Sequence, residues 1–239
     1  MFTLHKFFYN LFKTRFIRFI IYIYIFFGRI FILNAQSIID TNINLDKSKG
    51  FQQVKPFLGS SALIGIGSLT RSFQFSRKLD YKFNEFVIKS NIKKTNLDDF
   101  LPYSPIAALY GLEACGIKSR SGIKTMTLNL VCSQIVSGLS VYIIKNTTQI
   151  ERPDKSNKLS FPSGHTSLAF VSAQVLVEEY GHHSIWIPIS AYTVASTVGI
   201  LRITNKKHWL TDVITGAGIG ILSTKIVYHI NLKNKRTKV

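Results

Sequence analysis

Residues 159–181 read LSFPSGHTSLAFVSAQVLVEEYG, and this stretch indicates a long helix that begins near residue 164. Ser163 stands at a position that suits a helix N-cap, Gly164 follows it, and an apolar run continues from there. No Asp, Glu, Lys or Arg occurs from Leu159 to Val177, a length that suits a helix crossing a bilayer or buried on all sides. The stretch predicts a helix over 164–181 in an all-helical protein.

The segments on either side repeat this helical pattern. Helices are expected at about 103–117, 121–146, 186–203 and 210–230, separated by short polar joints. Further long runs without charge cover Thr125 to Ile144 and Tyr180 to Leu201. We therefore expect an all-α helical bundle embedded in a membrane, with about six apolar helices when the N-terminal segment is counted. A soluble bundle of fully buried helices is the alternative, because Ser, Thr, Asn and Gln interrupt every run.

The first 35 residues carry a targeting pattern. Basic residues precede an apolar stretch from Phe16 to Leu33, and no acidic residue occurs before Asp40. The stretch ends in Asn34-Ala35-Gln36, where Ala35 is a small residue of the kind that precedes a cleavage point. Residues 1–35 are predicted to be a signal peptide or an uncleaved N-terminal membrane anchor, so the rest of the chain would be exported or membrane-embedded.

Composition divides the remaining chain. Residues 36–100 include a basic amphipathic run and are expected to be an exported segment on the membrane surface; residues 101–230 would form the bundle, and residues 231–239 a basic tail. Thirty Lys and Arg against twelve Asp and Glu give a formal charge of +18, which indicates a polyanionic partner. Many of these cations lie at the ends of apolar segments, which favours a membrane and a phosphorylated lipid over nucleic acid. The two cysteines, Cys115 and Cys132, are expected to be small core residues.

Several polar residues at the predicted helix ends can bind a phosphoryl group. Lys145 closes one helix and Arg152 follows in the loop, so two cations can converge on one anion. Ser163 and Gly164 begin the next helix, where free amides and the helix dipole favour an anion. Arg202 ends a third helix and supplies another fork for phosphate oxygens.

Two histidines and an aspartate can supply the chemistry of phosphate transfer. His208 and Asp212 are four residues apart, so the carboxylate can accept the Nδ1 proton and leave Nε2 free to attack phosphorus. His165, in the first turn of the 164–181 helix, can protonate the leaving oxygen. A metal site is the sharpest rival, but two histidines and one aspartate among so many cations suit an anion better.

Together these clusters resemble a known family. Lys145-X6-Arg152-Pro153, Pro162-Ser163-Gly164-His165 and Arg202-X5-His208-X3-Asp212 look like the three signature motifs of the type-2 phosphatidic acid phosphatase and vanadium haloperoxidase superfamily, over roughly residues 100 to 230. In that superfamily a serine usually precedes the arginine of the third motif, whereas this chain has Leu201.

The resemblance implies a helical bundle of the type-2 phosphatidic acid phosphatase kind, working without a metal or other cofactor. His208 matches the residue that forms a phosphohistidine, Asp212 the residue that supports it, and His165 the general acid. The matches to the phosphate-binding residues are Lys145, Arg152, Ser163, Gly164 and Arg202. Because Leu201 replaces the usual serine, we expect one hydrogen bond near the phosphate to be lost.

The expected function is hydrolysis of a phosphomonoester or pyrophosphate on a lipid such as phosphatidate, an isoprenyl pyrophosphate or lipid A. The expected place is a bacterial inner membrane, with the active site facing the periplasm, because the positive-inside bias puts Lys118, Arg120 and Lys124 on the inner side. A soluble periplasmic acid phosphatase of the same superfamily is one alternative. A non-catalytic basic membrane-binding protein is another, and a haloperoxidase holding vanadate is a third.

Overall fold

The computed structural model describes residues 47–72, 74–89 and 94–236, and all the regular structure in these residues is helical. The chain divides into two units, residues 1–55 and 56–239, and only the start of α2 is described in the first unit. The helices are α2 (Lys47–Ser72), α3 (Gln74–Lys89), α4 (Leu97–Phe100), the 3-10 turn η1 (Leu101–Tyr103), α5 (Ser104–Ala114), α6 (Ile123–Thr148), α7 (Gly164–Tyr180), α8 (Trp186–Thr204) and α9 (Leu210–Arg236).

The all-α prediction is confirmed, and the predicted helices from residue 103 onward match α5 to α9 to within a few residues at each end, apart from the C-terminus of α9. That helix continues to Arg236, into the stretch predicted to be a basic tail. The predicted signal peptide or anchor, residues 1–35, lies outside the described residues.

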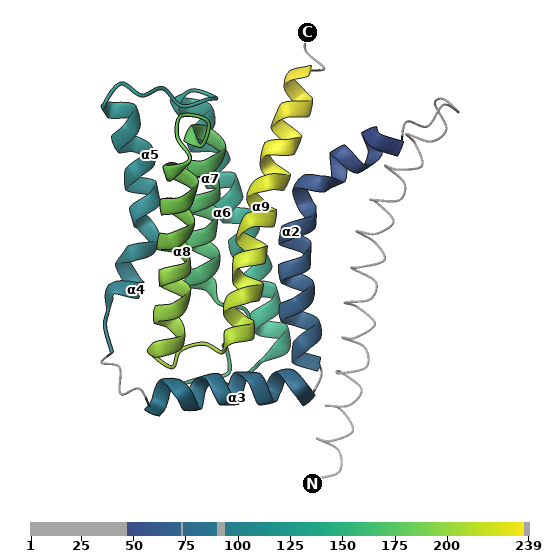
Figure 1. Cartoon of the computed structure of the whole chain (residues 1–239), viewed down its shortest axis with the longest axis vertical. Coiled ribbons are helices and arrows are strands. Elements are labelled where there is room, and N and C mark those ends of the chain that lie inside the picture. The colour runs from purple at the N-terminus through teal and green to yellow at the C-terminus, as the bar shows by residue number, and fades with distance from the viewer. Residues whose placement is uncertain (1–46, 73, 90–93, 237–239) are drawn as a thin grey trace. The chain divides into compact units, whose positions relative to one another are not determined.

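Helix α7 is the centre of the bundle in the second unit. It packs against α5, α6, α8 and α9, which surround it in Figure 1. Apolar side chains from these helices bury one another, and they include Leu109, Met126, Ala169, Val171, Ala173, Val175, Ala195 and Val198. Because α7 has neighbours on all sides, its charge-free run is explained by burial within the protein.

Helix α6 has polar residues on its buried face and apolar residues on its exposed face, the reverse of a helix at the surface of a water-soluble protein. Its polar residues Asn129, Ser133 and Ser137 are buried, and the Ser137 hydroxyl meets the Ser167 hydroxyl of α7 at 2.5 Å. Its exposed face is apolar and includes Leu128, Val131, Ile135, Leu139 and Tyr142. Small and polar residues between helices with apolar residues outside are typical of a membrane bundle, so the interruptions of the apolar runs lie in the contacts between helices.

Length and hydropathy agree with this arrangement. Among the described residues, three helices are long and apolar enough to cross a membrane: Ile123–Thr148, Trp186–Thr204 and Leu210–Ile230. Helix α5, with 11 residues, and α7, with 17, are shorter. The expectation that Cys115 and Cys132 are core residues is wrong: both are exposed and free, Cys132 because it lies on the outward face of α6.

Glycines let α9 approach its neighbours closely. A Cβ placed on Gly216 would lie 2.5 Å from the carbonyl oxygen of Ser163, and one on Gly220 would lie 2.5 Å from that of Ser167. On another side, a Cβ on Gly218 would lie 2.9 Å from the backbone nitrogen of Ile64 in α2. Only glycine fits these positions without a shift, so α9 holds the start of α7 and the second half of α2 at backbone contact distance.

Helix α3 crosses the end of the bundle where α8 and α9 are joined (Figure 1). Asp80 and Val87 of α3 are buried, whereas Tyr81 and Phe86 are more than half exposed. The sequence separates residues 36–100 from the bundle, but in the structure the part from Pro56 to Ser72 packs along α9 and α3 packs on α8 and α9. Residues before the first motif therefore help to form the end of the bundle that carries all three motifs.

Candidate active site

The first motif lies where α6 ends. Gln149 takes a left-handed conformation with φ of 45°, and its amide donates to the Lys145 carbonyl at 3.1 Å, which terminates the helix. The Lys145 ammonium then donates to the carbonyl oxygen of Leu159 at 2.6 Å. Arg152 lies in the following loop, where its amide donates to the Asn157 carbonyl at 3.0 Å. The loop thus folds back and brings both cations next to the start of α7.

The second motif forms the N-terminus of α7, as the sequence predicts. Ser163 is the N-cap: its hydroxyl meets the Thr166 hydroxyl at 2.8 Å and accepts from the Thr166 amide at 3.4 Å. The Ser163 amide donates to the Asp212 carbonyl at 3.0 Å, so the backbones of α7 and α9 are directly joined. The positive end of the α7 dipole therefore points into the region between the first and third motifs.

The third motif supplies a buried histidine and carboxylate. His208 and Asp212 are 1% and 0% exposed, and Nδ1 of His208 lies 3.4 Å from Oδ2 of Asp212. The same Oδ2 accepts from the Ser160 hydroxyl and from the Trp209 amide, the latter at 2.9 Å. The carboxylate is therefore fixed by these two donors on the Nδ1 side of the imidazole.

Burial controls the protonation of His208. Removal from water lowers its pKa to about 4, with Lys145 and Arg202 adding to the effect and Asp212 opposing it. The imidazole is consequently neutral at pH 7, with one ring nitrogen able to act as a nucleophile.

Arg202 is held by acidic residues that lie outside the three motifs. Its Nη1 donates to Asp98 at 2.6 Å and lies 3.5 Å from Asp99, and its Nε is buried with no hydrogen-bond partner among the described residues. Asn205 donates to Asp98 at 2.9 Å and to the Thr95 carbonyl at 2.7 Å. Asp98 thus fixes one edge of the guanidinium, while the Nε edge keeps a buried donor for an anion.

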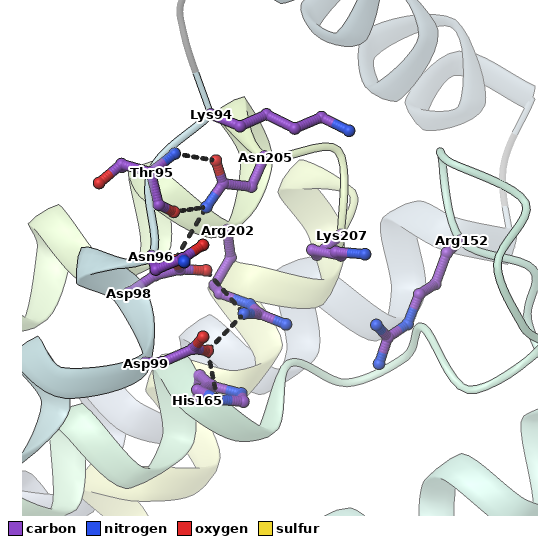
Figure 2. Close-up of a pocket in the computed structure, with 10 residues that line it drawn as sticks. All are labelled: Lys94, Thr95, Asn96, Asp98, Asp99, Arg152, His165, Arg202, Asn205 and Lys207. Atoms are coloured by element: carbon purple, nitrogen blue, oxygen red, sulfur yellow. Dashed lines mark hydrogen bonds and ion pairs between the residues drawn. The ribbon is translucent and has the colours of Figure 1, made fainter.

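A pocket of about 320 Å³ opens beside these groups (Figure 2). Arg152 and Arg202 extend into it from opposite sides, and His165 lies next to Asp99, with 3.4 Å between Nε2 and the carboxylate. Burial and the nearby charge of Arg202 lower the pKa of Arg152, whose Nε is also buried without a hydrogen-bond partner in the described part of the chain. Crowded, partly desolvated cations with unused donors are complementary to a small anion such as phosphate. The pocket is lined by Lys94, Thr95, Asn96, Asp98, Asp99, Arg152, His165, Arg202, Asn205 and Lys207.

A second contact joins the loop that carries Arg152 to the loop before α9. Asp154 accepts from the Lys207 ammonium at 2.8 Å, and its amide donates to the Lys206 carbonyl at 3.1 Å. Burial alone would raise the pKa of Asp154, but the hydrogen bonds from Lys207 and Ser156 hold it well below its usual range. The loop after α6 and the loop before α9 are therefore joined by an ion pair.

The structure brings the residues of all three motifs to one end of the bundle. Arg152, His165 and Arg202 line the pocket, and the charges of Lys145 and Arg202 help to lower the pKa of His208. Sequence reasoning missed Asp98, Asp99 and Ser160. The adjacent acids were the only available signal, since acidic pairs are scarce in so basic a chain, whereas nothing distinguishes Ser160 from other serines. Within the described residues, no group of three or more His, Cys, Asp or Glu could hold a metal ion.

Fold and site together define a class: an all-helical protein of the membrane type, with a pocket lined by arginine and lysine side chains at one end of its bundle. Residues 127–236 match the PAP2 superfamily and form a domain of that superfamily. The resemblance stated from the three motifs is thereby confirmed.

Two solved structures and one curated protein are similar to this chain. The transmembrane PAP2 type phosphatidylglycerolphosphate phosphatase of Bacillus subtilis is 22% identical, with a TM-score of 0.55 over 77% of this chain and 97% of that one, which shows a shared fold. LpxE of Aquifex aeolicus is 23% identical, with a TM-score of 0.49 over 66% of this chain and 96% of that one. The lipid A 1-phosphatase of Porphyromonas gingivalis is 36% identical over 138 residues, which are 57% of this chain and 31% of the relative, so this chain spans about a third of that protein.

Proposed function

We propose that this protein is a membrane phosphatase that hydrolyses a phosphate monoester of a lipid through a phosphohistidine on His208. The observation that carries the proposal is the buried, neutral His208 with its Nδ1 facing Asp212, at the same end of the bundle as a pocket crowded with cations. A neutral imidazole fixed by a carboxylate is a nucleophile, and crowded cations stabilise the charge of a transferring phosphoryl group.

Substrate binding follows from the donors around the pocket. The phosphate oxygens are bound by Lys145, Arg152 and Arg202 and by the free amides at the start of α7, next to Ser163 and Gly164. Asp98 holds Nη1 of Arg202, so the Nε edge of that side chain is the one that binds oxygen. The Lys and Arg side chains offset the negative charge of the phosphate, and the amides add hydrogen bonds, before any bond is broken.

In the first chemical step, Nε2 of His208 attacks phosphorus and the bond from phosphorus to the lipid oxygen breaks. Asp212 accepts the Nδ1 hydrogen and stabilises the positive charge of the phosphohistidine. His165 donates a proton to the departing oxygen, which leaves as an alcohol.

In the second step, His165 takes a proton from a water molecule, and the oxygen of that water attacks phosphorus. The bond from phosphorus to His208 breaks, inorganic phosphate leaves, and His165 holds the proton for the next cycle. The residues of this chain balance both proton transfers without a cofactor.

We further propose that the lipid carries its phosphate on a sugar, as lipid A does. The similarity to a protein named lipid A 1-phosphatase supports this choice over phosphatidate and an isoprenyl pyrophosphate. The pocket supports it as well, because the side chains of Thr95 and Asn96 offer neutral hydrogen-bonding groups suited to sugar hydroxyls. The apolar exterior of α6 would keep this headgroup site at the surface of a bilayer.

The proposed location is a bacterial inner membrane, with the pocket facing the periplasm. Lys118 and Arg120 belong to the connection between α5 and α6, and Lys124 lies in the first turn of α6. This connection lies at the end of the bundle opposite the α8–α9 connection (Figure 1). The positive-inside bias favours a cytoplasmic position for this basic connection, and the pocket would then be outside. Alkaline phosphatase fused at residue 156 should be active and fused at residue 119 inactive; the reverse pattern would overturn the orientation.

The test of the activity is phosphate release by the purified full chain in detergent. Lipid A, phosphatidate, an isoprenyl pyrophosphate and a soluble aryl phosphate are compared, with His208→Ala and with His182→Ala as a control histidine at the other end of the bundle. We expect release from lipid A that is lost in His208→Ala and kept in His182→Ala. Equal release from the aryl phosphate would favour a soluble-type acid phosphatase, and no release from any substrate would favour the non-catalytic membrane-binding protein.

A further inference from the structure

The first turn of α9 carries a catalytic candidate and needs its own amides satisfied. The amides at the start of a helix have no partner within the helix. Asp212, in the first turn, accepts from the Trp209 amide at 2.9 Å, which is one half of the reciprocal arrangement called a capping box. The other half requires an acceptor at the cap position, and the indole of Trp209 is only a donor. Its Nε1 donates instead to the Glu151 carbonyl at 2.9 Å.

A residue of α3 supplies the missing acceptor. Asp80 accepts from the Thr211 amide at 3.1 Å through Oδ1 and from the Thr211 hydroxyl at 2.8 Å through Oδ2. Asp80 is 6% exposed and Thr211 is 3% exposed, so both hydrogen bonds are shielded from water. The carboxylate also lies at the positive end of the α9 dipole, where a negative charge is favoured.

We propose that Asp80 is a positioning residue for the reaction: it completes the cap of α9 from outside the helix and thereby keeps Asp212 aligned with His208. This inference rests on the proposed function. Thr211 is the residue directly before Asp212, so a turn released by the loss of Asp80 moves the carboxylate that faces Nδ1 of His208. The same turn includes the Asp212 carbonyl that accepts the Ser163 amide.

A second contact of α3 acts on the same motif. The ring of Tyr81 meets that of Trp209 edge to face, with 5.4 Å between their centroids. Neighbouring residues of α3 thus hold the two residues that flank Leu210: Trp209 by ring contact and Thr211 by hydrogen bonds. Val87, seven residues further along α3, is also buried, at 4% exposed, and the hydrogen bonds and ring contact described above come from Asp80 and Tyr81, so Val87 offers a matched control.

The test compares Asp80→Ala, Asp80→Asn and Val87→Ala in the full chain. We expect kcat of Asp80→Ala to fall roughly tenfold or more while KM changes by about twofold or less, because misplacement of a reacting group acts on the transition state. Asp80→Asn keeps an oxygen for the Thr211 amide and should recover much of the loss. Val87→Ala should lower thermal stability and leave kcat near that of the unchanged protein. Equal loss of kcat in Val87→Ala and Asp80→Ala would overturn the proposal, since any loosening of α3 would then suffice.

A double-mutant cycle shows whether Asp80 acts through Asp212. In an Asp212→Asn background, Asp80→Ala should cause little further loss of kcat, because the group that it positions is already impaired. A full additional loss would mean that Asp80 acts elsewhere and would refute the inference.

Hydrogen exchange keeps the inference separate from the proposed activity. If the unchanged protein hydrolyses none of the substrates, the proposed function fails, but the cap can still be tested. Faster exchange of the first-turn amides of α9 in Asp80→Ala than in Val87→Ala would support the cap, and equal exchange in both variants would overturn it.

Discussion

The substitution Gly216→Ala tests whether close contact between α9 and α7 sets the geometry of the site. A Cβ at this position would lie 2.5 Å from the carbonyl oxygen of Ser163, and Cβ atoms in proteins essentially never come within 3.0 Å of another heavy atom. The two helices must therefore separate locally by at least 0.5 Å. The obstructing atom is backbone, so no side-chain rotation can relieve the collision.

The energetic cost has two parts with opposite signs. Overpacking of a close contact costs about 1–3 kcal/mol, and replacing glycine by alanine inside a helix returns up to about 1 kcal/mol. Gly138→Ala in α6 is the matched control, because nothing lies within 4 Å of a Cβ built there. The gain in helix propensity is common to both variants. The free energy of unfolding of Gly216→Ala should therefore be about 1–3 kcal/mol lower than that of Gly138→Ala.

The catalytic effect should exceed what stability alone predicts. Ser163 donates its amide to the Asp212 carbonyl, so a shift at Gly216 moves the start of α7 relative to the third motif. A displacement approaching 1 Å can cost on the order of a hundredfold in rate, and we expect kcat for lipid phosphate release to fall about tenfold or more. Thermal unfolding in detergent and initial rates measure the two effects. Gly216→Ala with the stability and kcat of Gly138→Ala would refute the reasoning.

Three further predictions follow from the site. The pKa of His208 is about 4 in the folded protein and about 6.5 in the unfolded chain, so between these pH values the unfolded chain binds a proton that the folded protein does not. The free energy of unfolding should therefore fall by about 3 kcal/mol as the pH is lowered from 7 to 4. His208→Asn should remove this part of the pH dependence in unfolding experiments. Asp154→Asn should weaken the link to Lys207, raise KM about threefold to tenfold by loosening Arg152 and leave kcat nearly unchanged; a selective fall in kcat would contradict this. Orthovanadate should inhibit phosphate release and a chelator should not, because the donors around the pocket suit an anion; activity lost in the chelator and restored by a divalent ion would show that a metal is required.

Helix positions were predictable because the spacing of apolar residues and the residues at helix ends are local features of the sequence. Residues 164–180 form a helix from Ser163 onward for local reasons: a serine cap, a glycine and an uninterrupted apolar run. The motif residues could be named for the same reason, since the spacing of His208 and Asp212 places them on one helix face wherever the helix lies. Composition also predicted apolar spans, and three helices of suitable length are present in the described residues.

The sequence does not show whether a polar residue in an apolar run faces another helix or faces outward. Ser133 and Ser137 interrupt an apolar run, which is equally compatible with a soluble helix. In the structure they meet α7, and the apolar side chains of α6 face outward. Only the packing partner decides whether such a serine is an interruption or part of a contact between membrane helices.

The sequence alone determined the helices, the three motifs and the resemblance to one superfamily, since all of these depend on residues close together in the chain. The tertiary structure alone decided what holds the motif residues. Asp98 reaches Arg202 across 104 positions and Asp80 reaches Thr211 across 131, with no spacing rule to connect them. Such pairs form because a buried charge or helix amide must find a partner wherever the fold brings one, and a linear sequence does not record that proximity.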